Sequence, residues 1–290
     1  MTEINPDITF VTAFLDIGRK DWAPEFARDP AFYVESFLNY LNYPYKMVCY
    51  IDDKYYDFII EKYASSPHTN KHFISINTEW LHEHIHAWSG IEKDRAIMNN
   101  PEYQKFIDGR LKLMYPNGIP ETNVRNHRCP ENIYPEYNAI NHAKIDFIAH
   151  AIENGYISTT FTAWCDFGYF RTYHSDGSPL PNPKFNTGML KTNQISLCLR
   201  YNIKPQDNNI LLTALSGNEL FIGAFYAGAT ASMKTFQTLY HECVEELRSV
   251  GITDDDQHIY IRCCLHKPDL FDLKIFNNPD WPKLISEFSL

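Results

Sequence analysis

The residues best placed for chemistry lie in the stretch Ile157–Arg171, which reads ISTTFTAWCDFGYFR. Its first half, rich in Ile, Thr, Phe and Trp, predicts a buried strand that stops at Asp166-Phe167-Gly168. A carboxylate at the end of a parallel strand lies in the crevice where open α/β sheets bind ligands, and it can hold a divalent cation or a ribose hydroxyl. Gly168 would let backbone and ligand approach closely. The alternative is that Asp166 only forms a turn or caps a helix.

A second candidate is His82-Glu83-His84-Ile85-His86, which fits the HExxH pattern. On a helix this spacing puts His82 and His86 on one face, where they could bind zinc with Glu83 as the base of a metallohydrolase. The metzincin extension is broken, because Ser89 stands where glycine is required and no third histidine follows at the right spacing. We favour a solvated, His-rich helix face, and zinc hydrolysis remains the alternative.

Three consecutive acidic residues, Asp254-Asp255-Asp256, precede Gln257 at the start of a predicted helix. Acidic residues at this place commonly cap the helix and stabilise its dipole. We expect one or two of the three to do only that. Lys144, on the predicted helix 137–154, is open to two interpretations: a surface charge, or a contact with a phosphate or carboxylate.

The composition narrows the class of protein. The 290 residues carry a net charge of −10 and no basic run, which argues against nucleic acid as a partner. Seven cysteines without a CxxC pair favour free thiols in a reducing compartment. No signal peptide is evident, and the most apolar stretch, Leu220–Ala231, is far shorter than the ~20 residues of a membrane span. We therefore expect a cytoplasmic protein without an integral membrane segment, and peripheral membrane association stays open.

The elements that must position these residues alternate between strands and helices. Asp29 and Pro30 predict a helix start, and Asn154-Gly155 predicts a helix end. Strands are expected at 8–15, 46–51, 72–76, 157–165, 195–201, 209–214 and 219–226, and helices at 30–42, 78–115, 137–154, 231–249 and from 254 onward. Strand-helix-strand repeats in the first half imply a parallel sheet with a nucleotide-sized crevice at its top.

Five stretches together resemble the HtrL/YibB family, a group associated with bacterial surface-polysaccharide loci. They are ITFVTAFLDIGR (8–19), Pro130-Glu131 with PEYNAINHAKIDFI (135–148), WCDFGYFR (164–171), ELFIGAFYAGATASM (219–233) and DDDQ (254–257). The family looks similar to glycosyltransferases of the GT-A type. The resemblance implies a single GT-A-like α/β domain over residues 1–290, in which a Rossmann-like, mostly parallel nucleotide-sugar-binding half (about 1–170) is joined to a smaller mixed-sheet acceptor half (about 171–290).

The resemblance also implies which residues contact the nucleotide-sugar. The base would lie in a slot lined by Phe14 or Tyr50, and Lys144 and Arg128 would face the donor phosphates. The full set comes from the first strand and its loop, the helix 137–154 and the stretch around Asp166: Thr12, Ala13, Phe14, Asp16, Arg19, Tyr50, Arg128, Lys144, Trp164, Asp166 and Gly168.

A divalent cation, Mn²⁺ or Mg²⁺, is the cofactor that the resemblance implies. Asp166 would occupy the place of the metal-binding Asp-x-Asp motif. Gly168 replaces the second Asp, so metal dependence stays open, with Lys144 and Arg19 or Arg128 as the alternative charge partners. His266 resembles the late histidine that completes the metal site in some GT-A families, and a surface histidine is the other interpretation.

The expected reaction moves a sugar from a nucleotide-sugar, with UDP-sugar as the first choice, to a hydroxyl of a surface glycan such as lipopolysaccharide or capsule. Under an inverting mechanism Asp255 or Asp256 would take the acceptor proton. Gly223 and Gly228 would let the acceptor approach the backbone, with Gln257 beside it. Two other classes remain: the zinc hydrolase, and a non-catalytic glycan- or nucleotide-binding protein of the same fold.

Overall fold

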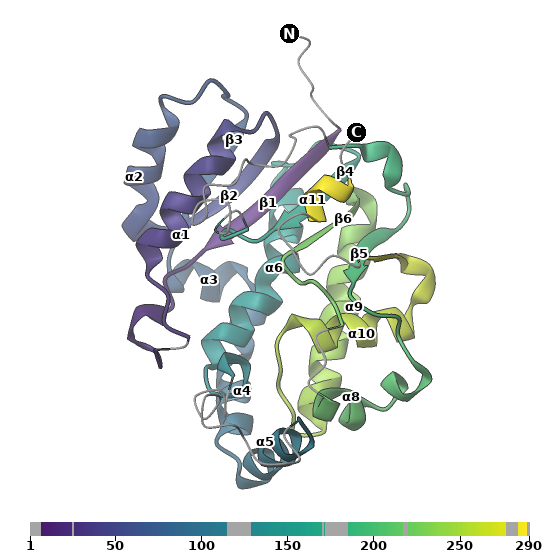
Figure 1. The fold of residues 1–290 in the computed structure, drawn as a ribbon. Coiled ribbons are helices and arrows are strands. Elements are labelled where there is room, and N and C mark those ends of the chain that lie inside the picture. Colours follow the sequence, from purple (N-terminus) through teal and green to yellow (C-terminus); the bar gives the residue numbers. More distant parts are fainter. Residues whose placement is uncertain are drawn as a thin grey trace.

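A seven-stranded mixed sheet forms the centre of the computed structural model, which describes residues 7–24, 26–114, 129–169, 171, 185–216, 220–276 and 284–288. The strand order is β3-β2-β1-β4-β6-β5-β7. The strands are β1 (Ile8–Phe14), β2 (Lys46–Asp52), β3 (Lys71–Ile76), β4 (Phe161–Cys165), β5 (Ile195–Leu199), β6 (Phe225–Ala229) and β7 (Phe271–Ile275). Figure 1 shows the sheet twisting across the upper part of the molecule.

The first four strands are parallel, as the strand-helix alternation predicts. β1 pairs with β2 on one side and with β4 on the other, and β3 extends the sheet beyond β2. Nearly every residue of β1, β2 and β4 is buried, which is typical of parallel strands covered on both faces. The carboxyl ends of β1 and β4 therefore meet at one edge of the sheet.

The second half of the sheet is mixed. β6 runs antiparallel to both β4 and β5, and β7 lies parallel to β5 at the edge. Because β6 runs against β4, the residues that enter β6 lie beside the residues that leave β4. The amide of Asp166 donates to the carbonyl oxygen of Ala224 at 2.8 Å. This reversal brings two distant parts of the chain to the same edge.

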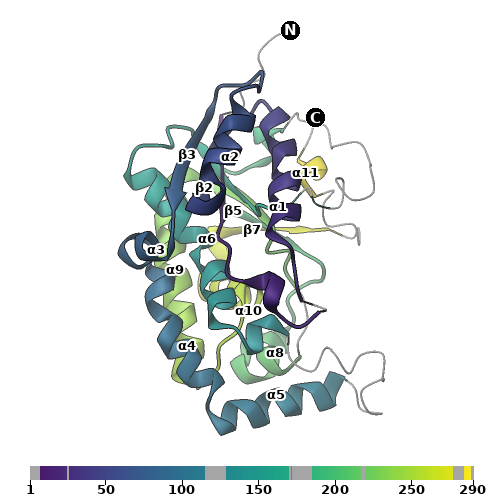
Figure 2. The same ribbon diagram turned by 90° about the vertical axis from the view of Figure 1, so that its left-hand side faces the viewer.

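Helices cover both faces of the sheet, as Figure 2 shows edge-on. One apolar cluster joins the sheet to α1 (Pro30–Phe37), α2 (Asp53–Tyr63) and α11 (Leu284–Glu287). The other joins it to α3 (Thr78–His84), α4 (Ile91–Met98), α5 (Pro101–Met114), α6 (Pro135–Glu153), α8 (Ile210–Ser216), α9 (Thr230–Ser249) and α10 (Asp256–His266). The architecture is thus α/β, as expected. None of the described helices is long and apolar enough to cross a bilayer.

Three predicted elements are wrong in detail. Residues 209–214 are expected as a strand but lie in α8, which Asn209 caps by accepting from the amide of Leu211 at 3.0 Å. The strand predicted at 219–226 begins only at Phe225. Residues 220–224 lead into the sheet and form an isolated bridge, between Phe221 and Leu199, instead of a continuous strand. The long helix expected at 78–115 is broken by extended backbone at Ile85 and by Pro101.

Candidate functional site

A cavity of about 570 Å³ opens at the carboxyl ends of β1 and β4. Residues after β1, residues after β4, the start of α6 and the loop before α10 line it together. These segments lie far apart in the sequence, and the reversal of β6 is part of what brings them together. A cavity of this volume can hold a small-molecule ligand.

Asp166 follows β4 directly and lines this cavity. The indole Nε1 of Trp164 donates to Asp166 Oδ1 at 2.7 Å, and the Nζ of Lys144 lies 3.3 Å from the same oxygen. The side chain remains 32% exposed, so the carboxylate stays accessible while Trp164 and Lys144 help to hold it. A carboxylate held in this way can accept hydrogen bonds from ligand hydroxyls.

Lys144 comes from the buried face of α6 and has three oxygen partners. Its Nζ donates to Asp256 Oδ2 at 2.7 Å and to the Gly223 carbonyl at 3.0 Å, and it pairs with Asp166. Burial alone would lower the pKa of Lys144, but the charges of Asp166 and Asp256 outweigh it and raise that pKa above its ordinary value. An ammonium group has three donors, so Lys144 orients Asp166 and has none left over for a phosphate.

Arginine side chains give the cavity wall nearest β1 a positive charge. Arg19 begins the 3-10 helix after Gly18, whose φ of 76° suits glycine, and its guanidinium lies 5.3 Å from the ring centre of Trp22 and 5.5 Å from that of Tyr137. Its Nε has no hydrogen-bond partner among the described residues. That atom is buried, so the suitability of Arg19 for an anionic ligand rests on its half-buried positive charge in the cavity wall.

Another part of the cavity wall is acidic. Glu131 and Asp254 face Arg110, whose nitrogens lie 3.9 Å from Glu131 Oε1 and 3.3 Å from Asp254 Oδ2, and His258 Nδ1 lies 2.8 Å from Asp254 Oδ2. Burial and the charge of Asp254 raise the pKa of Glu131 to about 7. Burial and the neighbouring carboxylates, Asp256 first, also raise the pKa of Asp255 well above its ordinary value. Burial opposes ionisation of Asp254, but His258 and Arg110 hold its pKa down at about 2.

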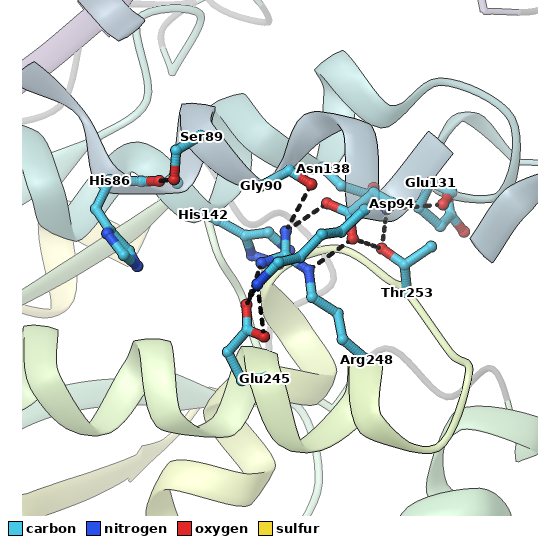
Figure 3. Close-up of polar contacts among 12 residues, drawn as sticks. His86, Ser89, Gly90, Asp94, Glu131, Asn138, His142, Glu245, Arg248 and Thr253 are labelled. Atoms are coloured by element: carbon cyan, nitrogen blue, oxygen red, sulfur yellow. Dashed lines mark hydrogen bonds and ion pairs between the residues drawn. The ribbon is translucent and has the colours of Figure 1, made fainter. Parts of the chain in front are cut away.

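A buried ion pair anchors the loop that carries this acidic wall (Figure 3). Asp94, which is fully buried, accepts from Arg248 Nε at 2.8 Å, from Arg248 Nη2 at 2.6 Å and from the hydroxyl of Thr253 at 2.9 Å. Asn138 donates to the Thr253 hydroxyl at 3.1 Å and to the Glu131 carbonyl at 2.9 Å. Because Thr253 precedes Asp254, this network ties α4, α6 and α9 to the acidic wall.

Most of the predicted site residues lie together in this cavity. The structure brings to its wall Ala13, Phe14, Arg19, Lys144, Trp164, Asp166, Gly168, Asp255 and Gln257. Predicted residues that do not line it are Thr12, Asp16, Tyr50, Gly223, Gly228, Asp256 and His266. Arg128 lies outside the described residues.

Asp256 contacts the interior instead of the cavity. Its carboxylate is buried and accepts from Lys144 and from the Tyr260 hydroxyl at 3.1 Å. Of the two predicted bases only Asp255 reaches the cavity, and its Oδ1 also caps α10 by accepting from the Gln257 amide at 3.1 Å. Asp255 therefore caps the helix and also lines the cavity, and its role as a base stays a prediction.

Gly223 and Gly228 do not line the cavity, and protein atoms fill the space that each glycine leaves open. A Cβ on Gly223 would lie 2.6 Å from Asp256 Oδ2, and one on Gly228 would lie 2.6 Å from the Gln194 carbonyl oxygen in the approach to β5. A Cβ on Gly168 would meet the ring of Tyr33 at 2.5 Å, so this glycine permits close packing even though it lines the cavity.

The first strand contributes less to the cavity than expected. Thr12 is fully buried in β1, and Asp16 turns back to accept from the Gly18 amide at 3.0 Å. Tyr50 is buried behind the sheet, where its hydroxyl lies 2.8 Å from His150 Nδ1, so it cannot line a base slot. Phe14 does line the cavity and stacks on Phe167 at 4.7 Å.

Among the described residues, neither the expected metal ligands Asp166 and His266 nor the alternative zinc ligands His82 and His86 together form a metal-binding group. His266 ends α10, whereas Asp255 at the other end of that helix lines the cavity with Asp166. The ten residue steps from Asp256 to His266 span about 15 Å. His82 and His86 do not share a helix face, because α3 ends at His84 and His86 begins a 3-10 helix. The ring of His86 instead lies 4.3 Å from that of His241.

Several cavity residues have no counterpart among the predicted site residues, namely Arg110, Glu131, Tyr137, Asn141, Asp254 and His258. Glu131 stands in the Pro130-Glu131 pair and Asp254 in the acidic trio, so both stretches carry a signal. For Arg110 and His258 no local pattern exists, because a single Arg or His on an otherwise ordinary helix resembles any surface charge.

Comparison with known proteins places these residues in a family context. A family model described as "Bacterial protein of unknown function (HtrL_YibB)" matches residues 6–289. The chain is similar to Protein HtrL of Escherichia coli (strain K12), with 24% identity over 282 residues that cover 94% of this chain and 89% of that protein. No solved structure matches the chain.

Proposed function

The chain belongs to the HtrL_YibB family, and from that premise we propose that it is a glycosyltransferase that uses a nucleotide-sugar donor. The observation that carries the proposal is the accessible carboxylate of Asp166, fixed by Trp164 and Lys144 at the end of a parallel strand. Glu131 and Asp255, two carboxyl groups with raised pKa values, line the same cavity. The parallel half-sheet joined to a mixed half agrees with the architecture expected of a GT-A-type enzyme.

The donor is proposed to bind along the β1 and β4 wall. Arg19 would contact the diphosphate, since its side chain lines the cavity and its guanidinium lies against aromatic faces. Asp166 would accept hydrogen bonds from hydroxyls of the ribose or of the donor sugar. A ligand that carries both negative charge and several hydroxyls satisfies both groups, and a UDP-sugar is the first choice.

The expected divalent cation does not fit the residues around Asp166. Lys144 lies between Asp166 and Asp256, at 3.3 and 2.7 Å, so an ammonium group already occupies the space between the two carboxylates. Among the described residues, no group of three metal-ligating side chains includes Asp166. We therefore assign neutralisation of the diphosphate to Arg19.

The acceptor hydroxyl is proposed to bind at the acidic wall. Its oxygen forms a bond to the anomeric carbon while the bond from that carbon to the diphosphate oxygen breaks, and the diphosphate leaves with the electron pair. Glu131 or Asp255 takes the hydroxyl proton. A carboxyl group whose pKa lies near neutrality combines an adequate ionised fraction with useful basicity, which favours Glu131.

The test is a thermal-shift screen of UDP-, GDP- and CMP-sugars, followed by assays of donor hydrolysis and transfer. A ligand at ~100 times its dissociation constant adds roughly 2.7 kcal/mol of stability, which such a screen detects. Binding should persist in EDTA. If no nucleotide-sugar stabilises the protein, the proposal fails; if one binds without turnover, the chain is a non-catalytic binding protein of the same fold.

The biological setting is part of the proposal. A surface glycan such as lipopolysaccharide or capsule is the acceptor class that we propose, with synthesis in the cytoplasm and peripheral contact with the membrane where lipid-linked acceptors are made. Zinc hydrolysis at His82 and His86 receives no support from the geometry of α3.

A further inference from the structure

A second group of side chains, far from the cavity that contains Asp166, brings together three different kinds of metal ligand. Cys243 and Glu246 lie three residues apart on α9, and His266 lies in the last turn of α10. The sulfur of Cys243, a carboxylate oxygen of Glu246 and a ring nitrogen of His266 all lie within 4.8 Å of one another. We propose that these three side chains form a zinc site that joins α9 to α10.

The spacing of the residues explains how the group forms. Residues three apart on a helix are neighbours on its surface, so Cys243 and Glu246 present adjacent ligands. The two helices pack against each other (Figure 1), which brings the end of α10 over this part of α9. His266 Nε2 already lies 2.9 Å from Glu246 Oε2, close to the separation of two ligands on one ion.

The chemistry of the ligands selects the ion. Thiolate, imidazole and carboxylate form a donor set typical of Zn²⁺, whereas Mg²⁺ and Mn²⁺ prefer oxygen ligands alone. Zn²⁺ binding would replace the thiol proton of Cys243, which passes to solvent, with a zinc–sulfur bond. The charges of the Cys243 thiolate and of Glu246 then balance the charge of the ion.

The proposed zinc site can be reached from solvent, and Arg262 holds one of its ligands in place. A surface cavity of about 600 Å³ is lined by Cys243, Glu246 and His266, so a buried thiol can be reached from solvent. Arg262 donates to Glu246 through Nη2 at 2.5 Å to Oε1 and through Nε at 3.1 Å to Oε2. The Oε1 contact can persist when Oε2 binds the ion, and such outer hydrogen bonds commonly orient metal-binding carboxylates.

The test measures metal content and affinity by elemental analysis and by titration with ZnCl₂ and CoCl₂ after chelation. We expect one zinc per chain, a rise in melting temperature on its return, and a thiolate-to-cobalt charge-transfer band in the cobalt protein. Cys243→Ser should remove that band. Cys243→Ser and His266→Ala should each lower the affinity for zinc. The loss should exceed the roughly 10–100-fold that follows removal of a residue that only hydrogen-bonds a metal ligand.

The matched control is His84→Ala, because the side chains of His84 and His266 are similarly exposed, at 41% and 47%. His84→Ala should bind zinc as the unaltered protein does. His266→Ala keeps the test valid even where Cys243→Ser folds poorly. Absence of zinc binding in the unaltered protein, unchanged affinity in His266→Ala, or loss of zinc in His84→Ala would each overturn the proposal.

Discussion

Two charged networks in this molecule look alike in composition and differ in exposure. In one, Arg248 holds Asp94 with two nitrogens, and Asp94 is fully buried (Figure 3). In the other, Lys144 holds Asp256 and Asp166, and Asp166 is left 32% exposed in the wall of a cavity. Both networks join distant segments of the chain. Only the second ends in a carboxylate that a ligand can reach.

Exposure of the carboxylate distinguishes a charged network that stabilises the fold from one that can bind a ligand. Every oxygen of Asp94 is occupied by Arg248 or Thr253, so that network can only stabilise the fold. Lys144 and Trp164 both contact the same oxygen of Asp166, which orients the group at the cavity wall. The first network should therefore govern stability, and the second should govern ligand binding.

Arg248→Met should cause the largest effect of the variants considered. It leaves the Asp94 carboxylate buried without its cation, and removal of one partner of a buried pair costs roughly 3–5 kcal/mol. Urea denaturation followed by circular dichroism measures the loss. Lys93→Ala breaks only the exposed pair with Glu245 and should cost about 0–1 kcal/mol. Equal losses of unfolding free energy in the two variants would show that burial does not set the contribution of the ion pair.

Asp166→Asn should reduce turnover without lowering the stability of the fold. We expect turnover of the nucleotide-sugar to fall at least ~100-fold, about 2.7 kcal/mol, because the amide cannot replace the oriented anion. Its denaturation midpoint should stay near that of the unaltered protein. Asp269→Asn, at an exposed position before β7, is the matched control. Near-normal turnover in Asp166→Asn would show that the cavity works without this carboxylate.

Glu131→Gln should change how stability depends on pH. The pKa of Glu131 is raised from 4.5 to about 7 in the folded protein, so the folded state binds this proton more tightly than the unfolded chain. The stabilisation is full below pH 4.5 and is lost as the pH rises through about 7. Glu131→Gln lacks this loss, so its stability relative to the unaltered protein should rise by roughly 1–3 kcal/mol between pH 5 and pH 8.

Denaturation midpoints at the two pH values measure that difference. Glu102→Gln, at an exposed position on α5, serves as the control. Its stability relative to the unaltered protein should be the same at both pH values. A Glu131→Gln difference that does not change with pH would mean that Glu131 is not held in its proton-bound form.

Gly223→Ala should have the smallest effect, and it tests how closely the second network is packed. The added Cβ would meet Asp256 Oδ2 at 2.6 Å and push it from Lys144, at a cost of about 1–2 kcal/mol. Gly109→Ala has no atom within 4 Å and should stabilise α5 by up to about 1 kcal/mol. Melting temperatures of the two variants should therefore move in opposite directions, and a shared direction would contradict the close contact.

The sequence predicts the fold best where a local signal is strong. The apolar runs of β1 and β2 and the cap at Asp29 lie where expected, since Asp29 accepts from the Ala31 amide at 2.9 Å. Residues 209–214 are misassigned because Ile and Leu runs suit a strand and a buried helix equally. β7 was not predicted, because its alternating residues at the sheet edge give a weak pattern.

The site is predictable only in part, for a physical reason. Asp166 is recognisable because a strand visibly ends there, and Arg19 because it follows the first strand. The partners of Asp254 come from α5 and α10, at Arg110 and His258, and nothing local marks either one. Contacts over such sequence separations depend on how the helices pack, which no single segment encodes.

The antiparallel course of β6 has a consequence for how the site is assembled. A fragment that stops at Arg171 would retain the four parallel strands and Asp166, yet it would lack the Gly223 carbonyl and Asp256 that complete the shell around the Lys144 ammonium. The contacts of Lys144 that orient Asp166 are therefore complete only after the later strands have docked. Binding competence should emerge as a late, whole-chain property that neither half of the sequence possesses by itself.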